Sequence, residues 1–411
     1  MKKPSSFIIS LTFILMAGCA PKQNPAEEPQ KEFPQGSFGH ALNFLKQYHD
    51  DLIVLNSPDS QAMLVVTPAY QGRVMTSTAR GLEGNSYGWV NYDLIASGEF
   101  EQHINVFGGE DRFWIGPEGG QFSVFFKEEA PFDFDNWFTP AAIDTEPWEM
   151  TEHTGQEARF TKDFTVTNYA GHSLALHIDR NIRLMGQEKV KERLGIDLPE
   201  KTGFVGFESE NIMTNVGENA WTRETGMPSI WILGMYNPTE KTIIFAPIMQ
   251  DTLDGKSVTD DYFGKVPEDR LSVTDDMVYF KADGKKRSKI GMPWGVATEF
   301  IASYSPEMNL LTIVQISLPA ERQDYVNSLW KLQDDPFNGD VINSYNDGPL
   351  ENGDQMGPFY ELESSSPAAA LPPAGSLTHI HSTFHFQGET ESLNIICLKL
   401  FGKSIEELEI K

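Results

Sequence analysis

The chain has 411 residues and is strongly acidic, with 59 Asp and Glu against 32 Lys and Arg and a formal net charge of −27. A chain of this charge repels phosphate backbones and anionic lipid surfaces, so nucleic acid is not an expected partner. Uronic and sulfated polysaccharides are disfavoured for the same reason, unless a local basic pocket or a bound cation offsets the charge. Only two cysteines are present, so disulfides do not explain the stability of the fold.

Residues 1–18 have the pattern of a secretory signal peptide. Two lysines precede an apolar run from Phe7 to Met16, and a small-residue pair and Cys19 follow it. This order resembles a bacterial lipoprotein signal, which implies that Cys19 is lipidated; the alternative is an ordinary signal peptide with an incidental cysteine. The apolar run is shorter than the ~20 residues that a membrane span needs.

Residues 19–38 are rich in Pro, Gln and Glu and contain few apolar side chains. A segment of this composition buries too little surface to fold, so we expect a flexible acidic tether. Ala20, rather than Asp, follows Cys19. By resemblance to the sorting pattern of Gram-negative lipoproteins, this favours the outer membrane. We therefore expect a lipid-anchored protein that faces the periplasm or the cell exterior.

Residues 39–408 are expected to form a single, monomeric domain of many antiparallel strands. Short apolar runs alternate with clusters of Gly, Pro, Asn and Asp, which favours a large all-β sandwich or barrel with few short helices. Amphipathic helices are predicted over His40–His49 and Glu188–Leu194. Cys397 lies in an apolar run that we predict to be a strand, where the thiol would be buried and unpaired. The main predicted strands are Leu52–Leu55, Ala62–Thr67, Arg73–Thr78, Phe122–Phe126, Phe164–Asn168, Leu174–Ile178, Ile230–Leu233, Thr242–Ala246, Met277–Lys281, Phe300–Tyr304 and Leu310–Ile316.

Two carboxylates stand out near the C-terminus. If Phe359–Ser364 is a strand, Glu361 and Glu363 point to the same side, because strand side chains alternate between the two faces of a sheet. Tyr360 and Leu362 then point to the opposite, apolar side. The alternative is a pair of acids on a solvated strand face.

Three of the nine histidines fall within seven residues, at His379, His381 and His385. A strand over Leu377–Phe386 places all three imidazoles on one face. Histidines at this spacing suit a divalent metal such as Zn²⁺, although a hydrogen-bonded or solvated trio is the more common arrangement. We expect these imidazoles and the two carboxylates to lie on neighbouring strands, where they would support acid–base or metal chemistry.

Several motifs resemble those of galactose-mutarotase-like proteins. Asn105–Glu118 (NVFGGEDRFWIGPE) resembles the Gly-Gly, Arg and aromatic–Pro hairpin in the first third of these proteins. Glu363 is followed four residues later by Pro367 and then by a Leu-Pro-Pro-Ala-Gly turn, which resembles the segment that carries the catalytic base of aldose 1-epimerases. Over about residues 38–405 the pattern resembles a family of bacterial lipoproteins within this superfamily. The resemblance implies an antiparallel β-supersandwich.

The resemblance also implies that Glu363 is a general base. Anomerisation of a sugar needs one group to remove the proton of the anomeric hydroxyl and another to protonate the ring oxygen. Glu361 would lie ~7 Å from Glu363 on the same strand face, where like charge raises one of the two pKa values. Related epimerases carry a histidine in mid-chain, whereas the matching segment here has Asn215 and no histidine. We expect His379 or His381 to supply the missing acid.

Other polar and aromatic side chains are candidates for holding the sugar. The planar donor fork of Arg112 suits hydroxyl or carboxylate groups, and an aromatic ring such as Trp114 can stack on a pyranose. The Gly-flanked run from Asn343 to Asp347 is either a tight turn or a sugar-binding loop. The candidate substrate-binding residues are Arg112, Trp114, Glu118, Asn215, Asn343, Tyr345 and Asp347.

The favoured function is carbohydrate binding in a cleft, with epimerase-like chemistry at Glu363 and no cofactor. One alternative is a non-catalytic glycan-binding component of a polysaccharide-utilisation system. Another is a metal-assisted polysaccharide lyase or hydrolase that uses the three histidines. Fold alone does not decide between them. The central structural expectation is that Arg112, Glu361, Glu363, His379 and His381 converge on one cleft.

Overall fold

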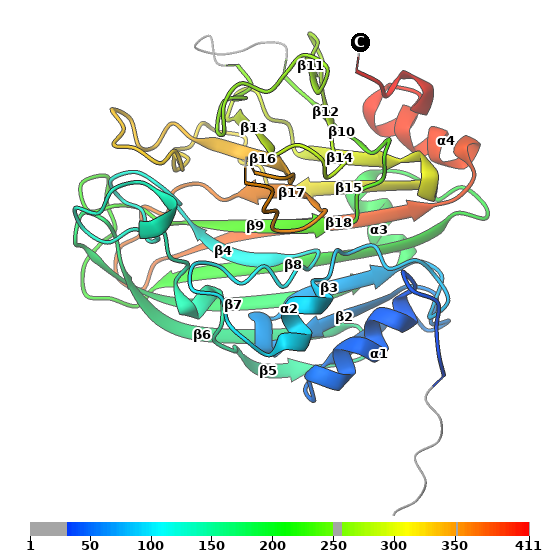
Figure 1. Cartoon of the computed structure of the whole chain (residues 1–411), viewed down its shortest axis with the longest axis horizontal. Helices are drawn as coiled ribbons and strands as arrows, with labels where there is room; N and C mark the ends of the chain where they lie inside the picture. Colours follow the sequence, from blue (N-terminus) through cyan, green and yellow to red (C-terminus); the bar gives the residue numbers. More distant parts are fainter. Residues whose placement is uncertain (1–30, 250–256, 351, 411) are drawn as a thin grey trace, which may run out of the picture. The chain divides into compact units, whose positions relative to one another are not determined.

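Antiparallel sheets make up most of the molecule (Figure 1). The computed structural model describes residues 31–249, 257–350 and 352–410, and Phe33–Lys411 forms one compact unit. The signal peptide, Cys19 and most of the predicted tether lie outside the described residues. The predicted all-β class is confirmed, because every strand pair in the three sheets is antiparallel.

The largest sheet has ten strands. Its centre is formed by long strands, which pair over up to twelve residues. In spatial order the strands are β11 (Leu271–Val273), β12 (Met277–Lys281), β10 (Ile243–Pro247), β14 (Phe300–Ser305), β15 (Leu310–Ile316), β18 (Ser376–Gln387), β8 (Gly203–Asn215), β7 (Ser173–Met185), β6 (Glu157–Thr167) and β5 (Glu149–His153).

A five-stranded sheet packs against the ten-stranded sheet, and a three-stranded sheet completes the fold. The five strands lie in the order β13 (Ser288–Pro293), β16 (Asp340–Asn346), β17 (Tyr360–Ser365), β9 (Ser229–Tyr236) and β4 (Arg112–Gly116). The three strands are β1 (Ile53–Asn56), β2 (Met63–Thr67) and β3 (Arg73–Thr78).

Four α-helices occur in the described residues, and they cover sheet surfaces. They are α1 (Phe38–Tyr48), α2 (Tyr92–Ser97), α3 (Gln187–Leu194) and α4 (Thr390–Phe401), and single turns of 3-10 helix are η1 (Pro68–Tyr70), η2 (Phe134–Asn136), η3 (Ala141–Ile143), η5 (Pro306–Met308) and η6 (Ile405–Glu407). Among the described residues, no helix is long and apolar enough to cross a membrane.

Helix α1 begins where Ser37 accepts a hydrogen bond from the backbone N–H of His40, which satisfies one free donor of the first turn. Its apolar stripe, which includes Leu42 and Leu45, packs on Met63 and Val65 of β2. The helix predicted over His40–His49 is therefore confirmed, and so is the one predicted over Glu188–Leu194, which is α3.

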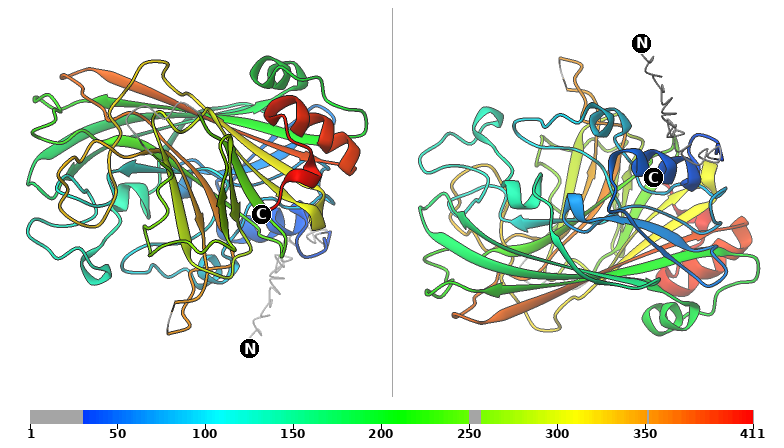
Figure 2. Two further views of the ribbon diagram at one scale, coloured as in Figure 1. Left: turned by 90° about the horizontal axis from the view of Figure 1, so that it is seen from above. Right: turned by 90° about the horizontal axis from the view of Figure 1, so that it is seen from below.

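The long strand β18 separates two different interiors. Phe384 and Phe386 point away from the five-stranded sheet and pack with α3 and α4, which lie together at one end of the ten-stranded sheet (Figure 2). His379, His381 and His385 point the other way, into the space between the sheets, and are fully buried. The alternation predicted for this strand is confirmed, but both of its faces are buried.

Two local predictions are wrong. Cys397 lies in α4 and not in a strand, although the thiol is buried as expected. Apolar residues lie on nearly all sides of α4, as they do in a buried strand. Hydrophobic periodicity therefore does not distinguish a helix from a strand here. Phe122–Phe126 is irregular, because its aromatic rings pack onto loops; Phe125, for example, stacks on Trp137.

Candidate functional site

The two faces of the five-stranded sheet differ in chemistry. On its central strand, β17, Leu362 packs into the core shared with the ten-stranded sheet, and Ser364 points to the same side, where it contacts His379. Glu361 and Glu363 point to the opposite side. The prediction that these two carboxylates share a face is therefore confirmed. This face of the sheet, which we call the polar face, carries the candidate site.

Loops cover the polar face and leave a pocket of about 100 Å³. All five strands of the sheet, β4, β9, β13, β16 and β17, supply side chains to the pocket, and loops from several parts of the chain supply the rest of its lining. Its apolar and aromatic lining consists of Ile104, Val106, Trp114, Phe134, Trp137, Trp231, Leu233, Met235, Phe263, Trp330, Tyr345, Met356 and Phe359, and its charged lining of Arg112, Glu118, Arg287, Lys289 and Glu361.

Two ion pairs reach the central strand from the two edges of the sheet. Arg112 of β4 donates to Glu361 Oε1 at 3.0 Å, and Lys289 of β13 donates to Glu363 Oε2 at 2.9 Å. The register makes these contacts diagonal, because Leu233 of β9 faces both Arg112 and Glu363. Each cation therefore reaches across one intervening strand, β9 for Arg112 and β16 for Lys289, to a carboxylate that is not in its own row of paired residues.

Trp231 holds Glu363 from a third direction. Its indole Nε1 donates to Glu363 Oε2 at 2.9 Å, and the Lys289 ammonium lies 4.9 Å from the centroid of the Trp231 ring. Glu363 itself has no exposed surface. One carboxylate oxygen is thus fully engaged beneath the pocket.

Several polar atoms of this site have no hydrogen-bond partner within the described residues. They include Glu363 Oε1, Arg112 Nε and Nη1, and the indole nitrogen of Trp114. A buried polar group without a partner costs about 1–3 kcal/mol, and most such groups in folded proteins are satisfied. Arg112 and Trp114 line the pocket, where a polar ligand or ordered water would satisfy their free donors, and the free acceptor of Glu363 lies beneath this lining.

The pKa values of the acids at this pocket are raised. Burial raises the pKa of Glu361 to about 8, and the nearby Glu363 carboxylate adds to this effect, although Arg112 opposes it. Burial also raises the pKa of Glu118. For Lys289 burial acts in the opposite direction, but Glu363 and the other acids outweigh it, so its pKa is raised. The neutral form of Glu361 is therefore favoured beside a protonated lysine.

A second group of polar contacts supports the β13 side of the pocket. Tyr262 donates to Asp340 Oδ2, and the Asn343 amide donates to the Tyr262 oxygen at 3.2 Å. Gly291 has no side chain at the point where Asp340 lies, since an added Cβ would come within 2.0 Å of Asp340 Oδ2. Burial raises the pKa of Asp340 to about 6.

Most of the residues predicted for substrate binding lie on this face. Arg112, Trp114, Glu118 and Tyr345 line the pocket, and Asn343 lies beside Glu363 in the register. Asp347 is one step removed: it accepts a hydrogen bond of 2.6 Å from the Tyr345 hydroxyl and another from the backbone N–H of Gly357.

The histidines do not join this site, contrary to our expectation. His379 Nε2 and His381 Nδ1 each lie 2.8 Å from Ser364 Oγ, on the face of β17 opposite to Glu361 and Glu363. The reason is that β18 belongs to the ten-stranded sheet, so its imidazoles meet the core side of the five-stranded sheet.

The three imidazoles do not converge on one point either. His385 Nε2 lies 2.8 Å from Glu110 Oε2, and its Nδ1 lies 2.8 Å from Thr312 Oγ1. The other two meet Ser364. In the part of the chain that the structure describes, no group of three or more His, Cys, Asp or Glu side chains is arranged to hold a metal ion.

Asn215 is also away from the pocket. Its amide donates to the backbone carbonyls of Asn219 and Leu371, at 2.9 and 3.0 Å. These bonds tie the end of β8 to two loops, so the residue has a structural role here. Asn215 lies in the segment that matches the histidine segment of related epimerases, but it does not line the pocket.

Three residues of the site were missed at the level of the sequence. Lys289 and Trp231 lie on strands without a recognisable motif, and Arg287 immediately precedes β13. The one usable signal was a lysine within an otherwise apolar and small strand, Ser288 to Pro293. A charged residue at such a position needs a partner, since lysine is rarely buried alone.

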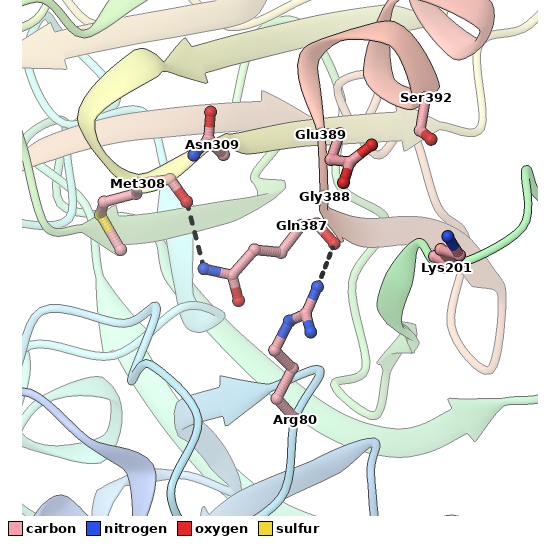
Figure 3. Close-up of a pocket in the computed structure, with 8 residues that line it drawn as sticks. All are labelled: Arg80, Lys201, Met308, Asn309, Gln387, Gly388, Glu389 and Ser392. Carbon is pink, nitrogen blue, oxygen red and sulfur yellow. Dashed lines mark hydrogen bonds between the residues drawn. The ribbon is translucent and has the colours of Figure 1, made fainter.

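A larger hollow of about 380 Å³ lies elsewhere, at the start of α4 (Figure 3). Arg80 donates to the Gln387 carbonyl at 3.1 Å, and the Gln387 amide donates to the Met308 carbonyl at 3.1 Å. Both side chains thus donate hydrogen bonds to backbone carbonyls around the hollow. None of the predicted site residues lines this hollow.

These observations define an all-β protein with an aromatic pocket built over two crossed ion pairs. The chain belongs to a family of unknown function, described as "Family of unknown function (DUF6786)", whose model matches residues 36–411. No curated protein matches the chain.

Several solved structures are similar to this chain at low sequence identity. A proposed aldose 1-epimerase of Escherichia coli K12 has 10% identity and a TM-score of 0.48, over 81% of this chain and 99% of that one. The Slr1438 protein of Synechocystis sp. PCC 6803 has 15% identity and a TM-score of 0.47, over 82% and 96%. A galactose mutarotase-like protein of Lactobacillus casei ATCC 334 has 10% identity and a TM-score of 0.44, over 82% and 99%. Membership of the family rests on the family model.

Proposed function

We propose that this protein binds a sugar in the pocket on the polar face and interconverts its anomers. The observation that carries this proposal is the pair Glu361 and Glu363 on one strand face, beneath aromatic rings. One carboxyl group has a pKa raised to about 8, and the other has a carboxylate oxygen, Oε1, without a partner. Two carboxyl groups in different environments are suited to act as acid and base.

The proposed chemistry assigns one step to each group. Glu363 Oε1 accepts the proton of the anomeric hydroxyl, while protonated Glu361 gives its proton to the ring oxygen, and the bond between that oxygen and the anomeric carbon breaks. Rotation of the open form and the reverse proton transfers close the ring as the other anomer. Lys289 and Trp231 hold the second oxygen of Glu363, so the free oxygen has a fixed direction.

The aromatic lining supports sugar binding. Trp114 and Trp231 stand edge to face with centroids 5.5 Å apart, and Trp137 and Trp330 add to the same wall. Rings of this kind cover the apolar face of a pyranose, while Arg112 and Glu361 lie among them to bond hydroxyl groups. A pocket with an apolar lining and a few placed polar groups is the usual form of a small-molecule site.

A non-catalytic binding role is the second candidate. It is favoured by the volume of about 100 Å³, which is below the range of about 300–1,000 Å³ that is usual for ligand pockets, and by the complete burial of Glu363. A sugar that reaches only Glu361 and Arg112 would bind without proton transfer at Glu363.

The test is anomer exchange on a panel of aldoses, followed by polarimetry and by NMR exchange spectroscopy. We expect the Glu363→Gln variant to lose ~10²–10⁴-fold in rate, the usual contribution of a general base, and to keep its affinity for the sugar. Glu299→Gln, at an exposed acid outside the pocket, is the control. Sugar binding without any exchange by the wild-type protein would leave only the binding role.

We also propose that the protein is a lipoprotein of the outer membrane. The support is the order of charged, apolar and small residues before Cys19 and the polar segment behind it. A lipid anchor of this kind would keep a sugar-binding protein in the compartment where glycans arrive.

A further inference from the structure

One cation of the pocket forms no ion pair with any acid among the described residues. Arg287 lines the pocket beside Phe263, and its guanidinium carbon lies 3.9 Å from the centroid of that ring. Its Nε is buried and has no hydrogen-bond partner in the described residues. Within the same residues, no carboxylate forms an ion pair with it.

The other two cations at this pocket are engaged. Arg112 is paired with Glu361, and Lys289 is paired with Glu363. Both ion pairs are nearly or completely buried, so the charge of each cation is balanced mainly by its carboxylate partner. Arg287 is the one of these three cations without an ion pair in the described residues, although it lies near enough to Glu118 to lower the pKa of that acid.

The balance of charges at the pocket differs from that of the whole chain. Three cations line it, Arg112, Arg287 and Lys289, against two acids, Glu118 and Glu361, whereas the whole chain has a net charge of −27. Glu363, beneath the lining, brings the count to three and three. Burial raises the pKa of Glu361 to about 8, which favours its neutral form at pH 7 and leaves three cations against two other acids.

The guanidinium carbon of Arg287 lies over the face of the Phe263 ring, 3.9 Å from its centroid. A guanidinium carries its N–H donors as a planar fork, and Arg287 supplies such a group to the pocket lining. A carboxylate or an ester of sulfate or phosphate accepts two parallel hydrogen bonds from such a fork. The neighbouring Tyr345 and Phe359 belong to the same lining.

We propose that Arg287 forms an anion subsite of the pocket and that the ligand is a sugar with a carboxylate, sulfate or phosphate group. This proposal rests on the proposed function for the sugar itself. It identifies the local basic pocket that an acidic protein needs in order to bind an anionic glycan. The excess negative charge elsewhere on the chain then disfavours anionic ligands outside the pocket.

The experiment compares the affinity of the full-length protein for matched sugars by calorimetry and NMR titration. The probes are galactose, galacturonate, galactose 6-sulfate and galactose 6-phosphate, with the corresponding glucose series. We expect at least one anionic series to bind ~10-fold or more tightly than the neutral parent, in line with hydrogen bonds to charged groups. The three anionic arms distinguish a carboxylate from the two esters.

The variant Arg287→Gln should remove this preference, so that the ratio of the affinities for the anionic and the neutral sugar falls to about one. Arg287→Lys keeps the charge without the fork and should restore part of the preference. Lys286→Gln is the matched control, because it removes one positive charge at the adjacent, exposed position outside the pocket lining. Melting temperatures of all three variants check that the fold is intact.

The possible outcomes separate the two proposals. Neutral sugars that bind as tightly as anionic ones, with no effect of Arg287→Gln, overturn the anion subsite and leave the proposed function standing. Anionic sugars that bind through Arg287 without anomer exchange support the subsite and reject the catalysis. Absence of binding to every sugar of the panel overturns both.

Discussion

Two carboxyl groups only two residues apart have different neighbours. Glu363 accepts hydrogen bonds from the Lys289 ammonium and the Trp231 indole N–H. Glu361 meets one guanidinium group, yet burial dominates and raises its pKa. The contact with Arg112 persists in both states, because a protonated carboxyl group still accepts a hydrogen bond through its carbonyl oxygen.

The raised pKa of Glu361 predicts the pH dependence of catalysis. If Glu361 is the general acid, the rate falls as pH rises through about 8, because the acid loses its proton. Glu361→Gln should lower the rate and remove this alkaline limb, whereas Glu118→Gln should keep the limb. Profiles of kcat/KM between pH 5 and 10 measure it. A limb that persists unchanged in Glu361→Gln would assign it to another group.

A steric prediction concerns Gly291. A Cβ at this position would lie 2.0 Å from Asp340 Oδ2, so Gly291→Ala must displace Asp340 and with it the contacts of Tyr262. Overpacking of this kind costs about 1–3 kcal/mol, and we expect a lower melting temperature and weaker sugar binding. Gly155→Ala, where no heavy atom lies within 4 Å of the added group, is the control. Equal melting temperatures of the two variants would contradict the prediction.

At the level of the elements, strand β17 divides the two polar regions of the molecule. One side carries Glu361 and Glu363 and the other carries Ser364, which meets two histidines. The period of two in the sequence was sufficient to predict that the acids share a face and that the imidazoles share a face. This alternation does not show which sheet each strand joins. The prediction that the acids and the imidazoles lie in one cleft was therefore wrong.

The buried histidines predict sensitivity to acid. Burial lowers the pKa of His379 to about 3 and that of His381 to about 4, below the usual 6.5 of the unfolded chain. The unfolded state therefore binds more protons below pH 6.5, and stability is lost as pH falls from 6.5 toward 4. Near pH 5 this loss is roughly 2 kcal/mol for each histidine.

The double variant His379→Asn/His381→Asn tests this expectation. It should melt at a lower temperature than wild type at neutral pH, because Ser364 loses its partners, but its melting temperature should fall less between pH 7 and 5. His172→Asn, at an exposed position, should follow the wild-type slope. Parallel slopes for the double variant and wild type would contradict buried, neutral imidazoles.

Some elements of the site were beyond the reach of the sequence for physical reasons. Lys289 and Trp231 act through diagonal contacts across the sheet, which depend on strand order and register. Neither contact is local in the chain, since Lys289 and Trp231 lie 74 and 132 residues from Glu363 in the sequence. Arg112, in contrast, was found because a local motif of glycine, arginine and aromatic residues marks its strand.

For the whole molecule, net charge and local charge lead to different conclusions. A formal charge of −27 argued against anionic glycans, but such a total says nothing about how cations are placed. Arg112, Arg287 and Lys289 are gathered at one pocket, where burial weakens screening by salt. A negative net charge therefore does not by itself exclude an anionic ligand at a pocket where cations are gathered.

The last prediction concerns attachment to the membrane. The order of residues before Cys19 predicts a lipidated N-terminus, and a lipid chain adds roughly 0.8 kcal/mol of membrane affinity for each buried CH₂ group. Cys19→Ser should therefore move the protein from the detergent phase to the aqueous phase in a Triton X-114 partition. Cys397→Ser is the control: this buried thiol of α4 lies far from the signal in the sequence, and the variant should partition like wild type. Retention of Cys19→Ser in the detergent phase would show that something other than this lipid holds the protein at the membrane.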